Sequence, residues 1–154
     1  MEGAGKTPGE ERKDKVEQMN EFDQLISELD TPLDIVGEPL DRVSAEKKRD
    51  KVIKKLVKIG DTRAVEPLIK TAEKSDFYEG FDLLSDTRYS AIKALGKLGD
   101  ERAVETLVKA LSDKDKDIRD SAIKALGKLG GKKAVEALGK ALSDKDKDIR
   151  GSAA

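Results

Sequence analysis

The chain has 154 residues, of which 41% are charged and 3% aromatic, and its formal net charge is −1. It contains no cysteine and no histidine, which excludes disulfides, tetrahedral zinc sites and nucleophiles paired with histidine. We therefore expect a protein that is not an enzyme and that holds no cofactor or metal. The high Lys and Glu content favours helices and is typical of a heat-adapted protein. No stretch is apolar enough for a leader or a membrane span, so the expected location is cytoplasmic.

Residues 1–12 are polar, rich in glycine and without periodicity, and we expect a disordered tail there. Residues 13–43 are predicted to form a capping helix followed by a linker. The helix is indicated by apolar residues that recur every three or four positions: Val16, Met19, Phe22, Leu25, Ile26 and Leu29. The linker is indicated by Pro32, Gly37 and Pro39.

The rest of the chain, residues 44–154, repeats itself. The segment SAIKALGKLG occupies 90–99 and again 121–130, and KALSDKDKDIR occupies 109–119 and 140–150, both at an offset of 31 residues. A fainter copy of the first segment lies upstream of residues 90–99, at an offset of 39 residues. Such periods predict stacked helical units, which we place at 44–72, 86–112 and 117–143, with an insertion at about 73–85 and a truncated last unit.

Each unit is predicted to be a pair of antiparallel helices. Ser44 is the expected N-cap of the first one. First helices should end at Gly60, Gly99 and Gly130, and only one to three residues then separate them from the second helices. The second helices are expected to bury Val65, Leu68, Val104, Leu107, Leu111, Val135, Leu138 and Leu142.

The pattern D-x-R-x-x-A-x-x-A-L-G-x-L-G-D-x-R-A-V-x-x-L, which runs from Asp86 to Leu107, resembles the short HEAT-like repeat of phycobilin lyases. The resemblance extends over about residues 44–152. It implies an all-α fold, an α-α superhelix or HEAT-like α-solenoid, here of about three helix pairs behind an N-terminal capping helix. It also implies that second helices line a concave face used for protein binding. The family includes lyase subunits that handle bilins.

The acidic runs DKDKD and the arginines Arg88, Arg119 and Arg150 recur in register. The runs lack the glycine that a calcium loop needs, so we expect solvated connectors in which Asp115 or Asp117 caps the next helix. The arginines either form a basic track for an anionic partner or hold the units in register. We favour the second role, with Asp86 pairing with Arg119 and Asp117 with Arg150.

Two groups of residues are predicted to bind a partner. The segment 74–90, which contains most of the insertion, gathers four of the five aromatic residues: Phe77, Tyr78, Phe81 and Tyr89. We expect Phe77 and Tyr78 to contact a partner while Phe81, Leu83 and Leu84 cover the junction between units. On the second helices, we expect the equivalent positions that differ between units to be exposed to solvent and to form a binding surface. They are Thr62, Pro67, Glu101, Thr106, Lys132 and Ala137.

The sequence thus predicts a non-enzymatic scaffold for protein–protein interaction that binds a protein partner on its concave face. One alternative is an accessory subunit of a lyase-like enzyme complex. Another is a nucleic-acid-binding solenoid. This alternative is less favoured, because residues 51–154 contain 23 basic and 18 acidic residues and the small excess of positive charge is spread over the whole segment. We expect no membrane association, and a monomer or weak self-association through the exposed C-terminal repeat.

Overall fold

The computed structural model describes residues 5–30, 39–74, 77–78, 81–82 and 85–154. This part of the chain is all-α, as predicted, except for one short β-hairpin that the sequence analysis did not predict. The helices are α1 (Pro8–Asp30), α2 (Pro39–Ile59), α3 (Val65–Glu73), α4 (Ser85–Leu98), α5 (Val104–Ala110), α6 (Lys116–Leu129), α7 (Gly131–Ala141) and α8 (Lys147–Ala153). The antiparallel hairpin consists of β1 (Phe77–Tyr78) and β2 (Phe81–Asp82).

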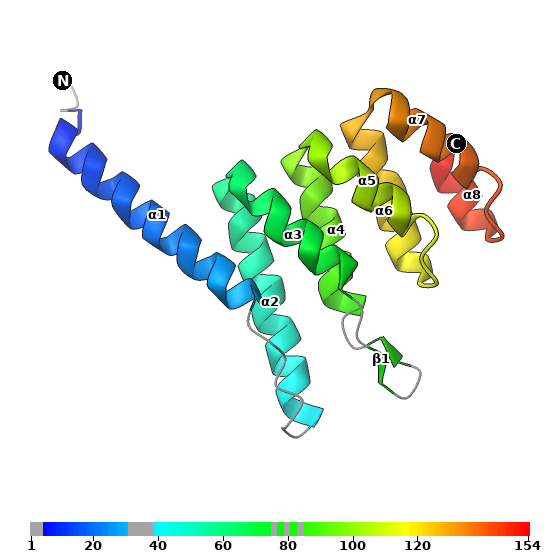
Figure 1. The fold of residues 1–154 in the computed structure, drawn as a ribbon, viewed down its shortest axis with the longest axis horizontal. Helices are drawn as coiled ribbons and strands as arrows, with labels where there is room; N and C mark the ends of the chain where they lie inside the picture. Colours follow the sequence, from blue (N-terminus) through cyan, green and yellow to red (C-terminus); the bar gives the residue numbers. More distant parts are fainter. Residues whose placement is uncertain (1–4, 31–38, 75–76, 79–80, 83–84) are drawn as a thin grey trace.

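The helices stack in two layers, as Figure 1 shows. One layer contains the first helix of each unit, α2, α4, α6 and α8, and its outer surface is called here the first-helix face. The other contains α1, α3, α5 and α7, and its outer surface is the second-helix face. Within each layer, every helix packs against the next one along the chain. The array is therefore held together by contacts between neighbouring units.

The core lies between the layers and repeats from unit to unit. Leu56, Leu95 and Leu126 occupy equivalent positions on α2, α4 and α6, and each is 0% exposed. Leu68 and Leu107 face them from α3 and α5 and are equally buried. Because these leucines recur at the repeat offset, one continuous apolar core runs along the stack.

The predicted glycines end the first helices. Gly60, Gly99 and Gly130 have φ angles of 71°, 68° and 66°, a left-handed conformation that glycine adopts at least cost. The aspartate that follows in two units caps a short 3-10 turn: the Asp61 carboxylate accepts the amide of Arg63 at 2.8 Å, and Asp100 accepts that of Arg102 at 3.0 Å.

The third unit departs from this pattern because Gly131 replaces the aspartate. Helix α7 begins directly at Gly131 with no side-chain cap. Val135, which corresponds to the fully buried Val65, is 64% exposed, and Leu142 is 47% exposed. The expectation that both are buried was wrong, because no described element packs over the outer side of α7.

Two helix starts also differ from prediction. Helix α1 begins at Pro8, within the segment expected to be disordered. Thr7 and Glu10 form a capping box there: the Glu10 carboxylate accepts the Thr7 amide at 2.8 Å, and the Thr7 hydroxyl accepts the Glu10 amide at 3.3 Å. Helix α2 begins at Pro39, so Ser44 lies inside the helix and is not its N-cap. Proline is favoured in the first turn, where its missing amide is not needed.

Helix α1 caps the stack with only part of its length. Phe22, Leu25 and Leu29 are buried against α2 and α3, as expected of a capping helix. Val16, the first residue of the apolar stripe, is 56% exposed because the N-terminal half of α1 extends away from the stack (Figure 1). In the described residues, none of the helices is both long and apolar enough to traverse a bilayer.

Candidate protein-binding surface

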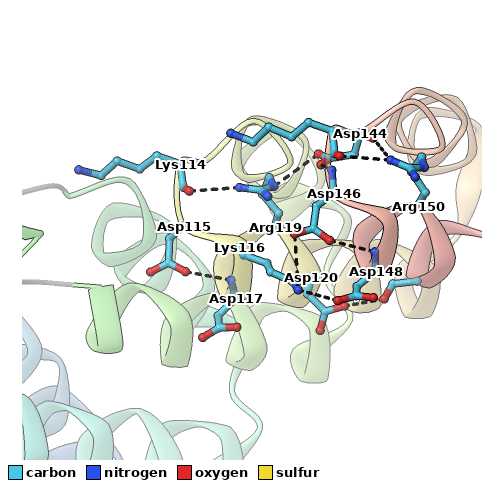
Figure 2. A network of polar contacts seen from close by, with 12 residues as sticks. Lys114, Asp115, Lys116, Asp117, Arg119, Asp120, Asp144, Asp146, Asp148 and Arg150 are labelled. Carbon is cyan, nitrogen blue, oxygen red and sulfur yellow. Dashed lines mark hydrogen bonds and ion pairs between the residues drawn. The ribbon is translucent and has the colours of Figure 1, made fainter.

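The acidic connectors are built from successive aspartates that hold their own backbone (Figure 2). Before α6, the Asp113 carboxylate accepts the amide of Asp115, and the Asp115 carboxylate accepts that of Asp117, both at 2.9 Å. Asp115, and not Asp117, is therefore the N-cap of α6. Asp146 caps α8 in the same way. The connector carboxylates thus act as caps, as the sequence indicated.

The repeated arginines tie each connector to the next. Arg119 is 4% exposed, and its Nη1 donates to the carbonyl oxygens of Asp113 at 2.9 Å and Lys114 at 3.1 Å. Its Nε lies 3.4 Å from the Asp144 carboxylate of the following connector (Figure 2). Arg88, 8% exposed, pairs equivalently with Asp113.

The favoured structural role of the arginines is therefore confirmed, but the predicted partners were wrong. Asp86 and Asp117 lie in the first turn of their own helices. Side chains near a helix start point toward its N-terminus, so the arginines reach the connectors instead. Because Arg88 and Arg119 are buried, they cannot form the exposed basic track considered for an anionic partner.

The second-helix face carries a regular set of ion pairs between neighbouring units. Arg102 on the turn before α5 lies 4.0 Å from Glu66 on α3, and Lys133 on α7 lies 3.3 Å from the equivalent Glu105 on α5. Lys109 of α5 also pairs with Glu73 of α3 at 3.0 Å, which lowers the pKa of that carboxyl. These exposed pairs form a constant frame along the face, although each is worth little energy.

Three of the predicted positions lie beside this frame. Thr62, Glu101 and Lys132 occupy equivalent places at the starts of the second helices, and all three are exposed. They present a hydroxyl, a carboxylate and an ammonium in successive units. Pro67, on α3, is half-buried. A binding role for these four residues stays a prediction.

Thr106 and Ala137 are not solvent positions, and their selection as binding residues was wrong. They are 5% and 4% exposed. The Thr106 hydroxyl donates to Glu73 of the neighbouring helix at 3.0 Å, and Ala137 belongs to the main core cluster. Both side chains face an adjacent unit and not the solvent.

The backbones of Phe77 and Tyr78 form β1, with Tyr78 opposite Phe81 in the hairpin. The side chains of these aromatic residues lie outside the part of the chain that the structure describes, as do Leu83 and Leu84. The expected division of the insertion between partner contact and core cover stays a prediction. The hairpin follows α3 and precedes α4, and it lies beside the start of α4 (Figure 1).

Tyr89, which the sequence analysis counted with the aromatic residues around the insertion without giving it a role, is the one exposed aromatic residue among the side chains described. It lies on α4 and lines grooves on both of its sides, toward α2 and toward α6. The signal was available in the repeat register, where Tyr89 occupies the position that Asp50 and Asp120 occupy in the adjacent units.

Comparison with known proteins gives one family and several structures. Residues 82–154, less than half of the chain, match the family model described as HEAT repeats. A chain in the structure of the complex of CpcE and CpcF of phycocyanin lyase from Nostoc sp. is 28% identical, with a TM-score of 0.58 over 93% of this chain and 44% of that one. No curated protein matches significantly.

Two further structures share the fold at lower identity. An engineered protein is 22% identical, with a TM-score of 0.52 over 88% of this chain and 60% of its own. A designed armadillo repeat protein in complex with the peptide (KR)4 is 23% identical, with a TM-score of 0.53 over 86% and 61%. The chain therefore spans less than two thirds of the length of each of these structures.

Proposed function

We propose that this chain, whose residues 82–154 match HEAT repeats, is a non-enzymatic scaffold that binds a protein partner on its second-helix face. The observation that carries the proposal is the arrangement of Thr62, Glu101 and Lys132. These exposed residues differ from unit to unit, while the ion pairs beside them join equivalent positions of successive units. A constant frame with variable exposed positions suits recognition by extended surface complementarity.

Two further observations support binding without chemistry. The polar groups of the connectors are engaged in caps and ion pairs, so none is arranged as a nucleophile beside a base. The 28% identical relative is one component of a complex of two proteins. We expect the partner to cross several second helices, because Thr62, Glu101 and Lys132 lie on three successive units.

The proposal is tested by placing a photo-crosslinking amino acid at single positions of the full chain in cells of the source organism. Incorporation at Glu101 or Lys132 should give one shared crosslinked protein, identified by mass spectrometry. The matched control is incorporation at Glu17, which is also exposed but lies on the outer part of α1. No shared product, or the same product from Glu17, would count against the second-helix face.

A second candidate function is supported by one observation, the 28% identity to a chain of the phycocyanin lyase complex. In this alternative, the array is an accessory subunit of a lyase-like enzyme complex and presents a partner or a prosthetic group. A visible absorption band that copurifies with the crosslinked complex would favour this alternative. A colourless complex without a transferase or lyase component would favour the simple scaffold.

A further inference from the structure

The first-helix face contains one place where the repeat pattern is broken at a charged position. Asp50 on α2 accepts a hydrogen bond from Ser90 of α4 at 2.7 Å and pairs with Lys54 at 2.5 Å. Asp120 on α6 repeats this with Ser152 of α8 at 2.7 Å and Lys124 at 2.6 Å. In these two units, an aspartate satisfies both its own lysine and the serine of the next helix.

The equivalent residue of α4 is Tyr89, which leaves two groups without that carboxylate. Ser121 corresponds to Ser90 and Ser152 and is 4% exposed, and its Oγ has no hydrogen-bond partner among the residues described. Lys93 corresponds to Lys54 and Lys124. Its Nζ lies 5.3 Å from the centre of the Tyr89 ring, and no carboxylate of the described residues lies within ion-pair distance of it. A buried, unpaired hydroxyl is uncommon in proteins and needs an explanation.

Tyr89 stands between two grooves. The smaller groove, of about 160 Å³, lies between α4 and α6, and Ser121 lines it together with four lysines: Lys93, Lys97, Lys124 and Lys128. Its one acidic lining residue, Asp120, is already paired with Lys124. The larger groove, of about 500 Å³, lies between α2 and α4 and shares Tyr89, Lys93 and Lys97 with the first.

We propose that this surface, the Tyr89 site, binds an acidic segment of a partner protein. A carboxylate of the segment would accept hydrogen bonds from Ser121 Oγ and Lys93 in the smaller groove, taking the place of the missing aspartate. The exposed face of Tyr89 would support an apolar part of the segment, since aromatic residues supply much of the contact energy in interfaces. Unpaired lysines around the groove attract negative charge during the encounter.

A protein carboxylate fits this site better than a nucleic acid. Asp50 and Asp120 flank the Tyr89 site on both sides, so the site offers one short positive patch and not the extended basic track that a phosphate backbone follows. Four lysines line the smaller groove and three line the larger one, two of them shared. The site lies on the first-helix face, so it is separate from the surface of the proposed function, and either can fail without the other.

The test uses the full chain and a short, dye-labelled polyglutamate peptide, with binding followed by fluorescence anisotropy at low and at moderate salt. The informative variant is Tyr89→Asp, which restores the residue that the adjacent units carry. It should keep or raise the melting temperature, because Ser121 and Lys93 regain a partner, while it weakens peptide binding about tenfold or more. Ser121→Ala should weaken binding without restoring a carboxylate.

Two matched controls complete the experiment. Ser143→Asp adds the same charge at an exposed connector position far along the chain, and Tyr89→Phe keeps the ring. Both should bind the peptide like the wild type. The proposal is overturned if the wild type does not bind polyglutamate, if Tyr89→Asp binds it equally well, or if an oligothymidine binds more tightly with the same sensitivity to Tyr89→Asp.

Discussion

The Nε of Arg119 lies 3.4 Å from the carboxylate of Asp144, although the two residues belong to successive units, and their side chains are only 5% and 14% exposed. Asp144 also accepts the amide of Asp146 at 2.8 Å. One carboxylate thus holds its own connector and the arginine of the unit before it. The pair sets the register between α6 and α8.

Asp144→Ala should therefore be strongly destabilising. It leaves the buried Arg119 without its carboxylate and opens the connector, and we expect a loss of about 2–3 kcal/mol in the free energy of unfolding. Urea denaturation followed by circular dichroism measures this. The control is Asp148→Ala, whose carboxylate pairs with Lys116 at 2.7 Å but is 64% exposed, so its loss should stay below about 1 kcal/mol. Equal losses in both variants would contradict a special role for the buried pair.

A second prediction concerns a close approach of two helices in the first-helix layer. A Cβ placed on Gly96 of α4 would lie 2.7 Å from the Cβ and 2.9 Å from the Cα of Ala125 on α6. Gly96→Ala should force the helices apart and cost about 1–3 kcal/mol. Gly127, the equivalent residue of α6, has open space around it, so Gly127→Ala should stabilise the protein by up to about 1 kcal/mol through helix propensity. Thermal unfolding of the two variants, side by side, should give shifts of opposite sign.

The third prediction is a pH dependence of stability. The Arg102 guanidinium, and then the Arg102 amide, donate to Asp100 and lower the pKa of its carboxyl from 3.8 to about 2. The folded state thus binds this proton more weakly than the unfolded state. The stabilisation is complete above pH 3.8 and is lost as the pH falls toward about 2. Denaturation of wild type and Asp100→Asn across this range should give curves that converge at the acidic end. A constant difference would show that Asp100 does not titrate in this way.

The fourth prediction concerns the insertion. If Phe77 and Tyr78 contact a partner, the double variant Phe77→Ala/Tyr78→Ala should abolish capture of that partner from lysate and leave the melting temperature unchanged. The comparison is Leu56→Ala in the core, which should lower the melting temperature strongly. A large fall in the melting temperature of the double variant would assign both aromatic residues to the core.

The repeat register predicted most of the fold because it fixes the same physical environment several times. Gly60, Gly99 and Gly130 each stop a helix, and the equivalent leucines Leu56, Leu95 and Leu126 are all buried. Errors arose where the register is interrupted. Val135 follows the pattern of Val65 in sequence, but its exposure depends on whether a neighbouring helix covers it, which a pattern within one unit does not specify.

The candidate site was less predictable for a similar reason. Thr106 and Ala137 vary between units, yet they face adjacent helices, and only the packing of α3, α5 and α7 reveals this.

Polar composition alone suggested disorder for residues 1–12, whereas the reciprocal bonds of Thr7 and Glu10 start a helix there. Tyr89 was detectable by comparing units position by position, because its neighbours in register are aspartates.

The close contact between Gly96 and Ala125 also bears on how the array deforms. Backbones that touch across α4 and α6 leave no room for compression and little leverage for bending, so this joint should be stiff. The joint between α2 and α4 contains a groove of about 500 Å³ and no comparably close backbone contact of a glycine. We therefore expect changes in curvature to fall less on the α4–α6 joint than on the α2–α4 joint, where they would widen or narrow the larger groove beside Tyr89.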